Sequence, residues 1–355
     1  MSIFELLVRV VAMLAGVALL AFFLLSASRA ALVNRHRGDW IAHTVGRIVC
    51  STVSRLAASR RHHASVQDVL AWILPLYILS LIVTWFLLVQ SAFSLILWST
   101  HIEPGFFKAF LASGSALSTL GFLTPDSAAG QLLAILEGAM GLGVVVFFFT
   151  FIPGYQSAIQ ARELKIAWLY ARSGVNPSSL VFVEWLQRSS HGADTSDVWE
   201  TWEEWFRLLA ETVAIAPVLS IVPTLHRRQS WLIAAATMLD AASFCLATLE
   251  GNALASARVC RATGIEALEL IAAKLHSSGI FPETASFNYS SRAAFDATCA
   301  QMAALNAPIK ADLHAAWEQY VALRNEFERP LAELAAKLLV SMQGGVLQQV
   351  PSVGA

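Results

Sequence analysis

Three apolar runs dominate the first half of the chain, at residues 7–26, 69–100 and 128–152. The second run contains no charged side chain, and Glu137 is the only ionisable residue of the third. An α-helix rises about 1.5 Å per residue and the hydrocarbon core of a bilayer is about 30 Å thick, so each run is long enough to cross it. The pattern predicts three transmembrane helices.

The first run also has the character of the apolar part of a cleaved signal peptide, because small residues and Arg29 follow it. A signal peptide begins with positive charge. The first eight residues contain Glu5 and neither Lys nor Arg, which favours a retained membrane span.

A short apolar segment, Phe106–Leu117, lies between the second and third runs and is followed by a loop containing Gly121. It is too short to cross a bilayer, so we expect a helix that enters the membrane and returns. Non-helical backbone at membrane depth is stable only when protein covers it or when it lines a water-filled path. This segment therefore favours a pore over a simple turn.

The composition changes to that of an ordinary helical domain from residue 155 onward, with no alternating strand pattern. We expect a mainly α-helical domain over residues 155–355. Its candidate helices are Ser157–Ser173, Ser178–Arg188, Asp197–Val213, Arg228–Glu250, Leu254–Leu275, Ser291–Asn306, Lys310–Phe327 and Pro330–Met342. Pro330 stands at the first helical position of the last one. Trp199, Trp202 and Trp205 recur every third residue, and we expect them to be buried in the domain's core or in a subunit interface rather than to form a partner-binding stripe.

Ser230–Leu249 is nearly long enough to be a further span. Asp240 lies near its middle, where a charge in a bilayer is costly. A buried core helix is the favoured interpretation, and a fourth span stays the alternative.

Charge and composition support a membrane protein. Only 14% of the residues are charged, against about 25% in soluble domains. Residues 27–66 are strongly basic, and short basic loops stay in the cytoplasm. We therefore expect a multi-pass plasma-membrane protein with its N-terminus outside and its C-terminus in the cytoplasm. The residues that carry this charge pattern are Arg29, Arg35, Arg37, Arg47, Arg55, Arg60 and Arg61, with His36, His43, His62 and His63.

The apolar and basic residues of Ile41–Leu56 alternate at helical spacing. An amphipathic helix of this kind binds anionic lipid at the inner leaflet; packing on the cytoplasmic domain is the open alternative. A nucleic-acid partner is excluded for the basic loop, because it is held between two spans.

No enzyme motif is present. The sequence has no HExxH, P-loop, GxGxxG or nucleophile elbow, which argues against an enzyme and against a bound cofactor. The four cysteines show no CxxC pair or regular spacing, and we expect reduced thiols rather than a disulfide or zinc framework.

The segment Ser118-Thr119-Leu120-Gly121-Phe122 resembles the filter of the potassium-channel superfamily, which reads Thr-Val/Ile-Gly-Tyr/Phe-Gly. The resemblance covers about residues 70–156 in the order outer helix, pore helix, filter and inner helix. It implies a pore module over residues 67–154, between an N-terminal helix at 1–26, the basic loop at 27–66 and the helical domain. It also implies four subunits around a pore for potassium or other monovalent cations, with backbone carbonyls as ligands.

The resemblance implies roles for further residues. The filter would comprise Thr119, Leu120, Gly121, Phe122 and Leu123, although Leu123 replaces the second filter glycine and leaves the outermost ion site altered or absent. Glu103 and Asp126 would lie at the outer mouth, or be solvated turn acids. Glu137 would brace the pore helix or face the cavity. Gly141 resembles a gating hinge, and Pro153-Gly154 an inner bend, with close packing and the end of the span as the alternatives.

A passive cation channel is therefore the expected function. The alternative is a non-conducting membrane scaffold or sensor that keeps the same fold, which the replacement of the second filter glycine by Leu123 favours.

Overall fold

A computed structural model describes residues 3–32, 39–58, 68–174, 177–190, 194–215, 217–226, 229–251, 254–276, 292–338, 342–343 and 346–347. Its regular structure is helical apart from one antiparallel pair of two-residue strands, β1 (Met342–Gln343) and β2 (Val346–Leu347). Among the described residues, four helices are long and apolar enough to cross a membrane, at Ile3–Arg29, Asp68–Ser99, Ala128–Ser173 and Trp231–Thr248. The prediction of an all-α membrane protein is confirmed at this level. The predictions for Arg35, Arg37, His36, Arg60, Arg61, His62 and His63 lie outside the described residues.

The chain divides into two compact units. The first contains Met1–Val49 and Pro75–Tyr155, and the second contains Cys50–Leu74 and Gln156–Ala355. Three helices have residues in both units: α2 (Trp40–Ala58), α4 (Ile73–Ser99), whose first two residues belong to the second unit, and α6 (Ala128–Ser173). Each unit is described by itself.

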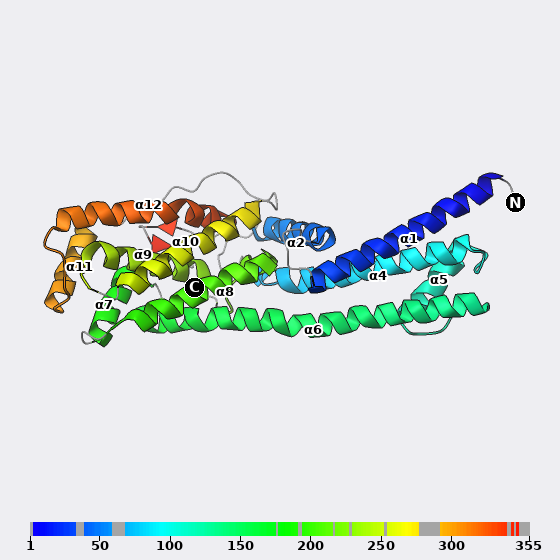
Figure 1. Cartoon of the computed structure of the whole chain (residues 1–355), viewed down its shortest axis with the longest axis horizontal. Coiled ribbons are helices and arrows are strands. Elements are labelled where there is room, and N and C mark those ends of the chain that lie inside the picture. Colours follow the sequence, from blue (N-terminus) through cyan, green and yellow to red (C-terminus); the bar gives the residue numbers. More distant parts are fainter. Residues whose placement is uncertain are drawn as a thin grey trace, which may run out of the picture. The chain divides into compact units, whose positions relative to one another are not determined.

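The first unit is built on α1 (Ile3–Leu32) and α4 (Ile73–Ser99), which pack along each other in opposite directions (Figure 1). Near one end, the Arg9 guanidinium donates a 2.6 Å hydrogen bond to the carbonyl of Trp98. Midway, Gly16 lets the two backbones approach, since a Cβ there would lie 2.8 Å from the Ala92 oxygen. Near the other end, the buried Trp85 indole donates to the Ser26 hydroxyl at 3.1 Å.

The short helix α5 covers Phe106–Leu117, as predicted, and Figure 1 shows it between α4 and α6. Its buried residues are small except for Leu117, which allows the neighbouring helices to come close. A Cβ on Gly138 of α6 would lie 3.2 Å from the Ala116 oxygen, and one on Gly141 would overlap the carbonyl of Leu117. Glycines on α6 therefore set the distance to the end of α5.

The helix α6 continues without a break from Ala128 to Ser173, through Pro153 and Gly154. The prediction of a separate helix at Ser157–Ser173 was wrong in this respect. Proline removes one helical hydrogen bond, here to the carbonyl of Phe149, and transmembrane helices tolerate that loss when the rest of the helix is satisfied.

The second unit is a helical domain that surrounds α9 (Trp231–Thr248), which is buried along nearly its whole length. The N-terminal cap of α9 is Ser230, whose hydroxyl accepts from the Ile233 amide. The helices around it are α7 (Ser179–Ser190), α8 (Ser196–Ile215), α10 (Leu254–His276), α11 (Arg292–Ala304) and α12 (Leu313–Lys337), with a 3₁₀ turn at Pro217–Ser220. Trp199, Trp202 and Trp205 are buried, as predicted.

The predicted break before Pro330 was wrong, because α12 runs through it as one helix. Pro330 is buried, and Phe327, Leu331 and Leu334 on either side of it are also in the core. Continuous burial of these side chains outweighs the one backbone hydrogen bond that proline removes.

Candidate functional site

The loop that follows α5 is tied to a single residue of that helix, Ser115. The amides of Leu120 and Gly121 donate to the Ser115 carbonyl at 3.1 and 3.2 Å. The amide of Leu123 donates to the Ser115 hydroxyl at 3.0 Å. Ser115 itself is fully buried. The loop is therefore pinned to the end of the helix at three points.

The backbone of this loop alternates in handedness. Thr119 has φ 58° and Gly121 has φ 68°, both in the left-handed region. Such alternation makes successive N–H groups converge on one side, as they do here on Ser115. Peptide bonds in the described chain are trans, and a trans peptide directs its C=O opposite to its N–H. The carbonyls of Thr119, Leu120 and Phe122 are therefore directed away from Ser115.

Side chains of the same loop divide into exposed and anchored ones. Leu120 and Phe122 are 72% and 66% exposed. Leu123, in contrast, packs against the buried cluster of Leu97, Ala109 and Ala112. Its φ is not positive, so this position does not require glycine. Leu123 thus serves as an apolar anchor at the end of the loop.

Glu137 on α6 is fully buried and accepts a hydrogen bond from the Ser113 hydroxyl on α5. The Ser113 hydroxyl also lies 3.0 Å from the carbonyl of Gln90, and the Gln90 amide donates to the Phe110 carbonyl at 3.2 Å. Polar groups from α4, α5 and α6 therefore meet directly behind the loop. Glu137 is therefore buried between α5 and α6 rather than on an exposed surface of the chain.

The two residues predicted at the outer mouth differ in environment. Glu103 is buried, with its carboxylate 3.1 Å from the Lys108 ammonium. Its charge is therefore matched within the chain, and it is not a solvated turn acid. Asp126, four residues beyond Phe122, is exposed.

The predicted hinge residues lie inside α6. Gly141 contacts the end of α5 at Leu117, the packing alternative of the prediction. Pro153 and Gly154 are exposed, and nothing lies within 4 Å of a Cβ added to Gly154. Gly154 therefore has open space around it, whereas Gly141 packs closely against the end of α5.

The sequence alone did not single out Ser113 or Ser115. Both lie in the segment LASGSALSTLG, where a hydroxyl in an otherwise apolar helix must find a partner once it is buried. That requirement is the signal that could have identified them.

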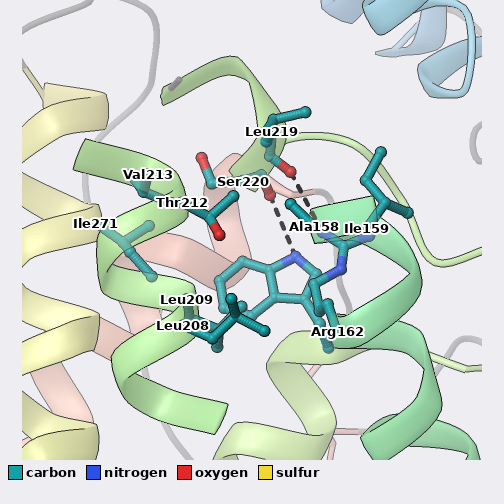
Figure 2. Close-up of a pocket in the computed structure, with 11 residues that line it drawn as sticks. Ala158, Ile159, Arg162, Leu208, Leu209, Thr212, Val213, Leu219, Ser220 and Ile271 are labelled. Atoms are coloured by element: carbon teal, nitrogen blue, oxygen red, sulfur yellow. Dashed lines mark hydrogen bonds between the residues drawn. The ribbon is translucent and has the colours of Figure 1, made fainter. Parts of the chain in front are cut away.

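The second unit contains a mainly apolar pocket, shown in Figure 2, between the α6 residues near Arg162 and parts of α8 and α10. Arg162 is its charged lining residue. Its guanidinium donates to Glu163 and to the carbonyls of Leu219, Val222 and Pro223 at 2.9–3.3 Å. The Trp231 indole donates to the Ser220 carbonyl at 3.2 Å. The Arg162 guanidinium and the Trp231 indole are thus both bonded within the domain, and we interpret the pocket as part of the domain's core rather than as a ligand site.

Metal binding finds no support within the described ranges, where no group of three or more His, Cys, Asp or Glu side chains could hold an ion. Cys50, Cys245, Cys260 and Cys299 are free and buried.

No protein-family model, curated protein or solved structure matches the chain. The fold defines a class, a helical chain with four candidate membrane-spanning helices in its described part, and the particular function must be argued from the site.

Proposed function

We propose that this chain is one subunit of a passive channel for potassium or other monovalent cations. The observation that carries the proposal is the tethered loop at Thr119–Phe122. Its amides converge on Ser115, so its carbonyls are directed to the exposed side. Carbonyl oxygens held in this way can replace the hydration shell of a cation. The carbonyl end of α5 adds partial negative charge next to them.

Several copies are needed to complete such a site. Irregular backbone at membrane depth requires protein cover or a water-filled path, and one loop cannot enclose a path alone. A ring of four subunits would place the carbonyls around one axis and cover the exposed Leu120 and Phe122 with neighbouring copies. This arrangement accounts for two large apolar side chains that are otherwise unpartnered in the single chain.

The proposed ion path is shorter than the family's filter. Leu123 is anchored among apolar residues and its amide is bonded to Ser115. The ligand set therefore ends at the carbonyl of Phe122, and the outermost ion site is missing. Weaker discrimination between potassium and sodium follows from fewer consecutive sites.

The proposed topology has three spans, formed by α1, α4 and the first part of α6. The basic residues between α1 and α4 lie in the cytoplasm of a plasma-membrane protein, with the N-terminus outside. The helix α9 is assigned to the cytoplasmic domain, because its Asp240 is buried 3.0 Å from Arg324 and accepts from Tyr320 at 2.7 Å.

A non-conducting scaffold or sensor with the same fold is the second candidate. The observation in its favour is the packing of Leu123, which closes the outer part of the loop with an apolar side chain. Cation flux decides between the two functions.

The test uses the purified full chain in liposomes, with potassium flux measured directly. We expect flux from the wild type and none from Gly121→Val, since a β-branched residue is strained at φ 68°. Gly105→Val is the matched control, because Gly105 has an extended backbone and nothing within 4 Å of an added Cβ. Unchanged flux from the Gly121 variant, or a wild type that is monomeric in detergent, would contradict the proposal.

A further inference from the structure

The helix α2 (Trp40–Ala58) has three distinct faces. One stripe is buried against the protein and consists of Ile41, Val45, Val49, Val53 and Ala57. A second stripe is exposed and basic, with His43, Arg47 and Arg55 at spacings of four and eight residues. A third is exposed and apolar, with Trp40, Ile48 and Leu56 at 64%, 57% and 58% exposure. Packing against the protein explains the buried stripe. It does not explain why an exposed apolar stripe lies directly beside an exposed basic one.

The basic stripe lies on a helix that carries no acidic side chain of its own, since Trp40–Ala58 contains no Asp or Glu. Neither Arg47 nor Arg55 forms an ion pair within the part of the chain that the structure describes. The preceding Asp39 is already used, because its carboxylate caps α2 by accepting from the amides of Ile41 and Ala42 at 3.2 and 3.1 Å. The positive charge of α2 is therefore available to an external anion.

The beginning of α2 is fixed to the ends of two candidate membrane spans. The Ser26 hydroxyl of α1 donates to the Asp39 carboxylate at 2.6 Å. The rings of Phe22 on α1 and Trp40 are 6.0 Å apart. On α4, the ring of Tyr77 lies 3.4 Å from a Cβ built on Gly46. The start of the helix is thus held against the ends of these two candidate spans.

We propose that α2 is a binding surface for the anionic phospholipid headgroups of the inner leaflet. Arg47 and Arg55 pair with headgroup phosphates, and Trp40 and Ile48 insert at the level of the acyl chains. Trp is favoured at that depth because its ring is apolar and its N–H is polar. A free phosphate in solution would use the arginines but not the neighbouring apolar stripe, so the combined surface fits a lipid.

This surface is connected to α6 by buried contacts. The Ser26 hydroxyl that binds Asp39 also accepts from the Trp85 indole at 3.1 Å. The Trp85 ring lies 5.2 and 5.5 Å from the rings of Phe147 and Phe148 on α6. Lipid bound to α2 therefore biases the position of α6. This consequence for ion flux rests on the proposed channel function, whereas the lipid surface does not.

Lipid binding is tested by native mass spectrometry of the detergent-solubilised full chain with phosphatidylglycerol or phosphatidylcholine. We expect selective retention of phosphatidylglycerol. Each basic residue near an anionic surface contributes roughly 5-fold in affinity, so Arg47→Gln/Arg55→Gln should lose about 30-fold. Arg258→Gln is the matched control, because Arg258 is also an exposed helical arginine, on α10. Equal retention by the double variant, or displacement of the lipid by inorganic phosphate alone, would overturn the lipid surface.

Flux in liposomes with and without phosphatidylglycerol tests the connection to α6. We expect higher flux with the anionic lipid, loss of that difference in the double variant, and loss of it in Ser26→Ala with lipid retention intact. A Ser26 variant that keeps the full lipid response would overturn the connection. Absence of flux in every lipid would defeat the channel proposal, while the retention measurement would still decide the lipid surface.

Discussion

Ser113 on α5 donates a hydrogen bond to the carboxylate of Glu137 on α6, and both side chains are fully buried. This contact joins the short helix to the long one at the level of the tethered loop. A side-chain hydrogen bond contributes about 0.5–1.5 kcal/mol net, and its value rises where water is excluded. The pair should therefore behave as one unit in stability.

We expect a double-mutant cycle of Ser113→Ala and Glu137→Leu to show a coupling energy of about 1–3 kcal/mol, from unfolding of the detergent-solubilised protein. The corresponding cycle with Ser118→Ala should show almost none, because the Ser118 hydroxyl donates to Gly114 within its own helix end at 2.6 Å. Additive effects for Ser113 and Glu137 would show that the contact is not energetically important.

Ser115→Ala should weaken cation selectivity. The substitution removes the hydroxyl that accepts from the Leu123 amide but leaves the backbone carbonyl that holds Leu120 and Gly121. An unsatisfied buried amide costs about 1–3 kcal/mol, so the outer end of the loop should loosen. The measurement is the ratio of potassium to sodium flux in liposomes. Ser118→Ala, which removes a neighbouring exposed hydroxyl, should leave that ratio unchanged; an equal ratio in both variants would exclude this role for Ser115.

Gly141→Ala separates close packing from hinge motion. An added Cβ at Gly141 would overlap the Leu117 carbonyl, whereas nothing lies within 4 Å of one added to Gly143 two residues later. Overpacking costs about 1–3 kcal/mol, while alanine in an open helical position stabilises by about 0.5–1 kcal/mol. The unfolding temperature should therefore fall for Gly141→Ala and rise for Gly143→Ala. Equal and small changes in the unfolding temperature of both variants would contradict a close-packing role for Gly141.

Much of the architecture could be predicted because it follows from period and length. The apolar runs gave the long helices, and Phe106–Leu117 was found with the bounds that the structure has. The two continuous helices through Pro153 and Pro330 were missed, because local proline chemistry argues for a break and only burial or neighbouring helical bonds overrule it. The sequence shows where a proline stands, but not the burial or the neighbouring helical bonds that keep the helix continuous.

The loop shows the same limit at the level of the site. Gly121 could be recognised because φ > 0 favours glycine. The anchoring by Ser115 depends on a hydroxyl and a carbonyl meeting amides five to eight residues later, after the chain has turned. In the sequence, Leu123 only marked the loss of the second filter glycine, whereas in the structure it packs against Leu97 and anchors the loop. Such roles depend on three-dimensional contacts rather than on residue spacing.

The last prediction concerns α9, which is both apolar enough to span a membrane and almost entirely buried in protein. Its Asp240 accepts from Ser179 at 2.5 Å and from Tyr320 at 2.7 Å, and it pairs with Arg324 at 3.0 Å. A carboxylate with these partners belongs to a protein core, so both ends of α9 should lie on one side of the membrane.

Cysteine labelling with a membrane-impermeant maleimide checks this topology. Leu225→Cys and Glu250→Cys place thiols at exposed positions on either side of α9. The native thiols should stay unlabelled, since all four are buried and burial raises the pKa of Cys299 to about 11, which suppresses the reactive thiolate. We expect both engineered cysteines to react only in inside-out vesicles, and Asp126→Cys, the control for the other face, to react only in intact cells. Labelling of Leu225→Cys and Glu250→Cys from opposite sides would show that α9 is a fourth span, and the proposed placement of the helical domain would then be wrong.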